Sequence, residues 1–346
     1  MEASTPDEAI VLTGCGWVTP FAHGSIAEVL TAARVLPDHP EPNEPYWGVP
    51  DRFVEECPSL PKEVRKDQGA WMSGIALEGA RLGASLEQHA LPDDRVGLVL
   101  GCSLAGQLSM IDFANEVREQ SARFVSPLHF PQTVGNYIAG VLARGYGLRG
   151  PNITIATGAA SGLDALVEAC VLLSSNQADV VLAGGTELLK AGLVEAMAQP
   201  GERFSEGACW FALERAGDAA SRGMQPLADI VRWERNTPER KQKGVTDDMM
   251  RSTCSHPSAG AIFIEHWTGK CLAAGGPAAV AAAIGAASGL EVPVADTSDP
   301  SSASPTVFAV RKLTSSSSTD RIQSAVVSET NEPHQTVLEL LIPSKL

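Results

Sequence analysis

Apolar runs and amphipathic runs alternate along the first 230 residues of the chain. Short, almost wholly apolar runs predict buried strands, and apolar side chains spaced three and four residues apart predict helices. The predicted strands are AIVLTG, RVGLVLG, NITIAT, ADVVLAGGTE and ACWFALERA. The predicted helices are SIAEVLTAARVL, AWMSGIALEGARLGASLE, QLSMIDFANEVREQ, VGNYIAGVLARGYGL and SGLDALVEACVLLSSNQ. This alternation predicts parallel strand pairing, with helices on the faces of the sheet.

The pattern breaks between residues 231 and 258, where the chain becomes polar and charged. We interpret this stretch as a connection. A thinner second half follows, with the apolar run AGAIFIEHW, an alanine-rich helix, and the predicted strands EVPVADT, PTVFAVRKL, SAVVSE and TVLELLI. We therefore expect an α/β protein built from two similar halves, residues 1–230 and 259–346.

The overall charge narrows the classes of partner. The chain has 346 residues, of which 44% are hydrophobic, and a formal net charge of −15. Such an acidic chain argues against binding to nucleic acid or to an anionic membrane surface. A local basic patch for an acidic carrier domain stays open, and scattered, solvated arginines are the commoner alternative. The candidates for this patch are Arg118, Arg123, Arg144 and Arg149.

Cysteine usage and the lack of targeting patterns predict a cytoplasmic protein. The seven cysteines are dispersed, and no C-x-x-C pair indicates a zinc or redox site. The chain does not open on a basic segment followed by an apolar run, and no stretch of about 18 apolar residues predicts a membrane span. We therefore expect no metal, no membrane contact and no bound cofactor.

The stretch ITIATGAASGLDAL, residues 153–166, carries the most informative pattern. It predicts a buried strand, a tight turn and a helix, the layout that places a nucleophile at a helix N-terminus. Free N–H groups and the helix dipole would stabilise a thiolate there, and a neighbouring amide would serve as an oxyanion hole. The turn, however, is Gly-Ala-Ala at 158–160, which contains no nucleophile. Ser161 lacks an adjacent general base, so we expect it to cap the helix.

The blocks around this turn resemble those of β-ketoacyl synthases. VLTGCGWVTPFAHG is similar to the opening strand and loop of that family, and ADVVLAGGTE and SEGACWFALE match two later blocks. The most diagnostic block of the family resembles FVSPLHFPQTVGNYIAGVLARGYGLRGPNITIATGAASGLDAL. The resemblance spans residues 9–215 and weakens beyond them. It implies a thiolase-like fold, in which two similar α/β halves make a layered α-β-α-β-α sandwich.

Residue by residue, the resemblance implies that the chemistry is lost. The nucleophilic cysteine of the family falls on Ala159, and a methyl group cannot attack a thioester. One family histidine falls on Lys270, and the second histidine motif has no counterpart between Val231 and Ile264. The glycine- and phenylalanine-rich gating loop of the family is replaced by SETNEPHQ. These degenerate positions imply that no acyl-enzyme forms on this chain.

The relatives in this family that lack the catalytic residues are the chain-length factors of type II polyketide systems, including those paired with polyene-type synthases. The resemblance implies a heterodimer with an active ketosynthase, whose acyl tunnel this chain would close at one end. The substrate would arrive on the phosphopantetheine arm of an acyl carrier protein. The implied tunnel residues are Gln107, Leu108, Met110, Ile111 and Ala114. For Met110 and Ile111, ordinary core positions are an equal alternative.

Two other functions stay open. A malonyl-carrier decarboxylase would need a histidine, and the lysine at position 270 argues against it. A homodimeric scaffold that only binds carrier protein would form a stable homodimer. His129 and His334 are expected to bond backbone carbonyls rather than to act as acids or bases. His256 and His266 are too far apart in sequence for an i, i+4 metal pair, and GGTE is a weak phosphate-loop signal.

Overall fold

A computed structural model of the chain describes residues 9–34, 46–88, 91–104, 106–121, 123–198, 203–236, 260–262, 271–288, 290, 306–312, 323–331 and 334–342. In chain order, its main elements are β1 (Ile10–Val18), β2 (His23–Gly24), α1 (Ile26–Ala33), β3 (Tyr46–Trp47), α2 (Arg52–Glu56), α3 (Gln68–Gly83), β4 (Val96–Gly101), α4 (Gln107–Gln120), η5 (Phe130–Thr133), α5 (Tyr137–Tyr146), β5 (Asn152–Ile155), α6 (Ser161–Ser174), β6 (Val180–Glu187), α7 (Ala191–Met197), β7 (Phe204–Ser205), β8 (Gly207–Arg215), α8 (Ala216–Ser221), β9 (Ala228–Asn236), β10 (Gly260–Ile262), η7 (Leu272–Ala274), α11 (Gly275–Ala287), β11 (Thr306–Lys312), β12 (Gln323–Asn331) and β13 (His334–Ile342).

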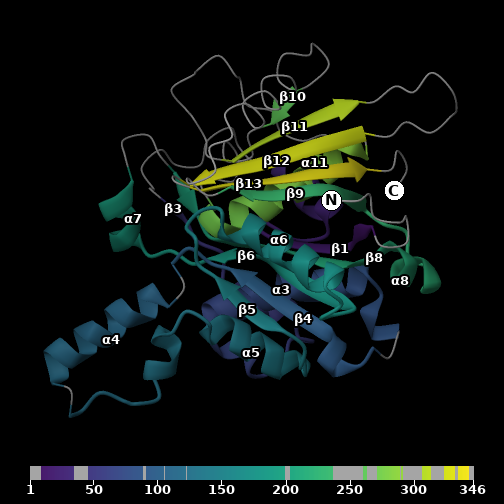
Figure 1. The fold of residues 1–346 in the computed structure, drawn as a ribbon. Coiled ribbons are helices and arrows are strands. Elements are labelled where there is room, and N and C mark those ends of the chain that lie inside the picture. The colour runs from purple at the N-terminus through teal and green to yellow at the C-terminus, as the bar shows by residue number, and fades with distance from the viewer. Residues whose placement is uncertain are drawn as a thin grey trace, which may run out of the picture.

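The strands pair in the order β10-β11-β12-β13-β9-β1-β8-β6-β4-β5, and Figure 1 shows the helices arranged around them. Apolar side chains on both faces of the central strands explain the layers. In β8, Cys209 and Phe211 point into one buried cluster, while Ala208 and Trp210 point into another. The first cluster is completed by α6 and α11, and the second by α3 and α5. A strand apolar on both faces needs helices on both sides, and β8 has them.

Parallel pairing is confirmed for one part of the sheet only. β4 pairs in parallel with β5 and β6, whereas β8 is antiparallel to both β6 and β1. β9 and the described strands of the second half, β10 to β13, pair with one another antiparallel throughout. Apolar composition predicts a buried strand but does not encode its direction, because the direction depends on the path of the connecting segment.

β9 joins the two halves of the sheet. It runs from Ala228 to Asn236, across the predicted start of the connection at residue 231, and pairs with β1 on one side and β13 on the other. The residues that continue the connection, 237–258, lie outside the described residues. So do the predicted strand EVPVADT and position 270.

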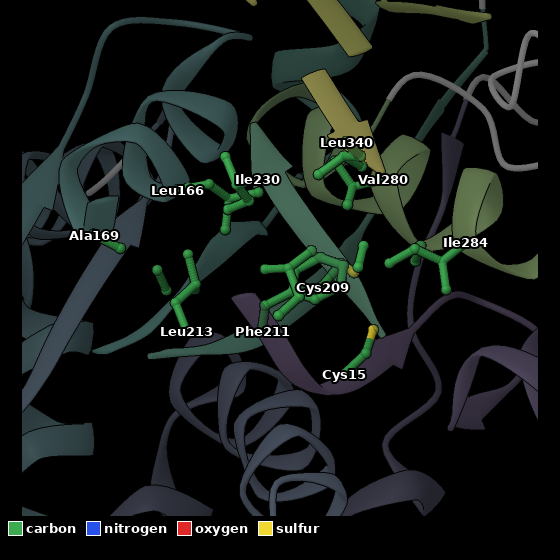
Figure 2. Close-up of a cluster of buried hydrophobic side chains, with 14 of the residues drawn as sticks. Cys15, Leu166, Ala169, Cys209, Phe211, Leu213, Ile230, Val280, Ile284 and Leu340 are labelled. Carbon is green, nitrogen blue, oxygen red and sulfur yellow. The ribbon is translucent and has the colours of Figure 1, made fainter. Parts of the chain in front are cut away.

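The main core lies between α6, α11 and the strands that face them. Figure 2 shows Leu166 of α6 and Val280 of α11 near Phe211, Ile230 and Leu340, which come from β8, β9 and β13. All five side chains are at most 3% exposed. The described layers are thus α3 with α5, the first part of the sheet, α6 with α11, and the β9–β13 part. This arrangement confirms the predicted layered α/β architecture.

Candidate functional site

The predicted strand–turn–helix elbow is present between β5 and α6. Gly158 has a φ of +87°, in the left-handed region that glycine adopts without strain. Ala159 follows it, half-buried, directly before the N-cap residue Ala160. The N-terminus of α6, a helix of 14 residues, carries the partial positive charge that would favour a thiolate or an oxyanion. The backbone therefore suits a nucleophile, but the side chain of Ala159 is a methyl group.

Ser161 is held inside the turn. Its hydroxyl accepts the N–H of Thr157 at 2.9 Å and donates to the carbonyl of Gly158 at 2.5 Å, and the side chain is fully buried. The prediction that Ser161 caps the helix is wrong, because Ala160 is the N-cap and Ser161 is the first helical residue. With its proton already donated and no exposure, the Ser161 hydroxyl is not placed to act as a nucleophile.

Glycines let the neighbouring backbones touch the start of α6. A Cβ added to Gly101, at the end of β4, would lie 2.3 Å from the carbonyl oxygen of Ser161. A Cβ added to Gly162 or Gly185 would lie 1.9 Å from the carbonyl oxygen of Ala273 in η7. The ends of β4 and β6 and the short helix η7 therefore pack directly around the elbow.

The predicted position of the second catalytic group, Lys270, lies outside the described residues. Cys271, the next residue, is buried, with its sulfur 2.7 Å from the Ser205 hydroxyl. Because η7 begins one residue later and touches Gly162, the chain next to position 270 comes close to the elbow.

Glu187, which the sequence analysis did not single out, is the most highly connected polar group at this site. Its carboxylate accepts the N–H of Ser103 at 2.9 Å, of Leu104 at 3.1 Å and of Ala273 at 3.3 Å. The Ser103 hydroxyl in turn donates to the elbow carbonyl of Gly158 at 2.7 Å. Complete burial raises the pKa of Glu187, while bonds from Ser103, Leu104 and Ala273 act in the opposite direction.

The sequence did hold a signal for this residue. Glu187 ends the otherwise apolar strand VVLAGGTE, and a carboxylate buried in such a strand requires hydrogen-bond partners. The identity of those partners was not predictable, because main-chain N–H groups leave no trace in the residue types. The predicted Gly-Gly turn is itself part of β6 rather than a loop.

The predicted tunnel residues lie on α4, as expected, and they are mostly exposed. Met110 and Ile111 are 54% and 46% exposed, so the alternative that they belong to the core is wrong for the single chain. Gln107 and Ala114 are also exposed, and Leu108 is the buried residue of this helix. All of the tunnel candidates except Leu108 therefore face out of the single chain.

The helix α4, η5 and the described residues between them form a projection that we call the arm (Figure 1). Within it, the rings of Phe113 and Phe130 meet edge to face at 6.0 Å, and His129 Nδ1 lies 3.1 Å from a Glu116 carboxylate oxygen. His129 thus pairs with a carboxylate rather than with the expected backbone carbonyl. The arm exposes five large apolar side chains, Met110, Ile111, Phe124, Leu128 and Phe130, and Val134, directly after it, is exposed as well.

The four candidate basic residues, Arg118, Arg123, Arg144 and Arg149, are all exposed. The first two belong to the arm and the last two lie in or just after α5.

A cavity of about 300 Å³ lies at the ends of the strands that are opposite the elbow. It is lined by Val11, Ala216, Ala219, Ala220, Gly223, Met224, Gln225, Pro226 and Asp229. Val11 pairs with Glu214 near the end of β8, whereas Glu187 of the elbow region pairs with Gly207 at its start. The length of β8 therefore separates this cavity from the elbow, and the cavity is not the predicted acyl tunnel.

Comparison with known proteins shows what the chain around this site is similar to. Residues 73–223 match the family described as "Beta-ketoacyl synthase, N-terminal domain". The 3-oxoacyl-[acyl-carrier-protein] synthase 2 of Rhizobium meliloti (strain 1021) is 28% identical over 195 residues, which are 51% of this chain and 46% of that protein. The synthase 2 of Vibrio cholerae serotype O1 is 37% identical over 113 residues, 32% of this chain and 26% of that protein. Residues 73–223 are therefore similar to the N-terminal domain of β-ketoacyl synthases, and the matched segments span less than half the length of either relative.

Solved structures extend the likeness to the whole chain at the level of the fold. A chain from the structure of a type II PKS acyl-carrier protein in complex with its ketosynthase is 16% identical, with a TM-score of 0.70 over 96% of this chain and 99% of that chain. The ishigamide ketosynthase/chain length factor is 22% identical, with a TM-score of 0.69 over 97% and 99%. The chain therefore has the ketosynthase-like thiolase fold. Among the described residues, no helix is both long and apolar enough to cross a bilayer.

Proposed function

We propose that this chain is a non-catalytic chain-length factor of type II polyketide biosynthesis, of the highly reducing or aryl-polyene type. One observation carries the proposal: Ala159 occupies an elbow whose turn, helix and packing are otherwise complete. Without a thiol at this position no acyl-enzyme can form there, so the chain would serve an active partner. The fold shared with a ketosynthase/chain length factor supports this proposal.

Two features support a partner subunit on the arm side of the molecule. β5 ends the strand order, so the outer edge of this strand has no neighbouring strand within the described chain. An uncovered edge strand tends to pair with another chain. The arm adds a group of exposed apolar side chains, and large exposed apolar patches mark interaction sites. An active ketosynthase that covers both features would form the heterodimer.

In this proposal, α4 of the chain would line the acyl tunnel at the subunit interface. Met110 and Ile111 are exposed in the single chain and would become buried against the partner. Their bulk would then limit how far an apolar polyketide can grow. An acyl carrier protein would deliver the growing chain on its phosphopantetheine arm, and the exposed arginines are candidates for contact with that acidic domain.

Product length tests this function. The chain is co-purified with an active ketosynthase from the same source and supplied with malonyl-carrier protein. Met110→Ala should lengthen the product by about one extension unit, and Met110→Trp should shorten it, because an occupied volume blocks growth. Leu82→Ala, on an exposed leucine at the end of α3, is the matched control and should leave the product unchanged. Identical products from all variants would contradict the proposal.

The same reaction separates the alternatives. Acyl adducts should appear on the ketosynthase and not on this chain, as read by intact mass. Acetyl-carrier protein formed by this chain alone would instead indicate a malonyl-carrier decarboxylase. A homodimer that binds carrier protein and leaves the product unaffected would indicate a scaffold.

A further inference from the structure

We propose that Glu187 is a positioning residue that fixes the root of α4 relative to the elbow. The root consists of Ser103 and Leu104, the described residues that precede Gly106 and α4. The consequence for product length rests on the proposed function, whereas the anchoring itself does not.

The anchoring follows from the contacts of one carboxylate. Glu187 receives the two main-chain N–H groups of the root on separate oxygens, Oε2 from Ser103 and Oε1 from Leu104. Oε2 also accepts the N–H of Ala273 in η7, which is itself packed on Gly162 of α6. The buried Glu187 side chain of β6 therefore ties the root of α4 to η7, and both β6 and η7 pack on the elbow.

Only a carboxylate satisfies this arrangement. Both oxygens act solely as acceptors, and N–H groups approach both of them. In Glu187→Gln, one oxygen becomes an NH₂ group that faces an N–H, and a buried donor without an acceptor loses its hydrogen bond. In Glu187→Asp, the charge remains, but the side chain is one methylene shorter and cannot reach both segments.

Apart from its packing on η5 within the arm, α4 has few described contacts that hold it in place. Leu108 is its buried residue, and the rest of the helix is exposed or half-exposed. Asp112 pairs with Lys190, but both side chains are at least half exposed, and such surface pairs contribute little. A helix of 14 residues is about 21 Å long, so a tilt of about 10° at the root moves its far end by 3–4 Å and Met110 by about 1 Å.

Glu206 offers a matched control. It is 2% exposed and accepts the N–H groups of Val49 at 2.8 Å and Leu189 at 3.1 Å, together with the Gln68 amide at 3.0 Å. Burial raises the pKa of Glu206 as it does that of Glu187. Glu206 is thus a buried carboxylate of the same kind, but it bonds Val49, Gln68 and Leu189 rather than the root of α4.

Hydrogen exchange read by mass spectrometry tests the anchoring on the full chain, in whichever assembly it purifies. Glu187→Gln should speed exchange in the segment 103–120 about tenfold or more, because a lost buried hydrogen bond opens the root. Glu206→Gln should leave that segment at the wild-type rate. Glu187→Asp, measured alongside, should speed it as well and retains the charge if the Gln variant does not fold.

Equal effects of the Glu187 and Glu206 variants on residues 103–120, or no effect of the Glu187 variants, would overturn the positioning role. In the reconstituted complex, Glu187→Gln should broaden the distribution of product lengths, with Glu206→Gln giving the wild-type product. Faster exchange with an unchanged product would support the anchoring role of Glu187 and overturn its link to the proposed function.

Discussion

At position 159, a methyl group occupies a turn whose backbone suits a thiol. The left-handed Gly158, the bonds of Ser161 and the packing of Gly162 hold the turn, and none of them involves the side chain of Ala159. The shape of the elbow is therefore independent of the nucleophile. This independence explains how the site can persist in a chain that has no thiol there.

Ala159→Cys restores the missing side chain and should create a reactive thiolate. The N-terminus of α6 should lower its pKa below the ordinary value for cysteine, so that alkylation by iodoacetamide persists below neutral pH. The wild-type chain is the control, because its described cysteines are buried except for Cys57. Burial raises the pKa of the Cys57 thiol. An Ala159→Cys thiol that reacts only at alkaline pH would contradict the proposed electrostatics of the elbow.

A second residue-scale prediction concerns stability. Glu214 is fully buried and forms a two-pronged pair with Arg222, at 2.7 and 2.8 Å from its two oxygens. Arg222→Ala leaves that carboxylate without its cation and should lower the free energy of unfolding by about 3–5 kcal/mol. Denaturation in urea measures the loss. Adding Glu214→Gln to the same variant should recover part of it, and a single-variant loss below about 1 kcal/mol would contradict this assignment.

At the scale of single elements, residue patterns predicted most of the architecture. The run QLSMIDFANEVREQ predicted a helix over the residues that α4 occupies, and NITIAT and SGLDAL predicted the strand and helix of the elbow. Periodicity could not show that α4 projects from the chain. Its apolar positions are as regular as those of a core helix, although most of them are exposed or half-exposed in the described chain.

For single elements, the testable prediction concerns the exposed side chains of the arm. Phe124 and Leu128 are 72% and 80% exposed, so changing both to serine removes little packing within the chain. The free energy of unfolding should change by less than about 0.5 kcal/mol. Association with the ketosynthase should weaken about tenfold or more, because buried aromatic and aliphatic side chains dominate interface energies.

Leu82→Ser, an exposed leucine on α3, is the control for the arm and should change neither quantity. Binding is measured by titration of the purified subunits and stability by denaturation. A double variant of the arm that loses stability but still binds its partner at the wild-type affinity would show that the arm is internal structure rather than an interface.

At the scale of the whole molecule, the layered α/β class followed from the sequence, but the strand directions did not. β8 lies between β6 and β1 and is antiparallel to both of them. β9 joins the two halves of the sheet through a short pairing with β1. These relations depend on contacts between residues about 200 positions apart, such as Thr13 with Glu214. No local pattern encodes them. The same is true of Glu187, whose partners come from residues 103–104 and 273.

The mass of the purified complex tests the central claim most directly. The chain is co-expressed with an active ketosynthase from the same source, and the eluted peak is measured by light scattering. The account predicts one copy of each subunit, held by a large apolar interface, and an aggregated or insoluble chain when it is expressed alone. A well-behaved homodimer of this chain that ignores the ketosynthase would contradict it.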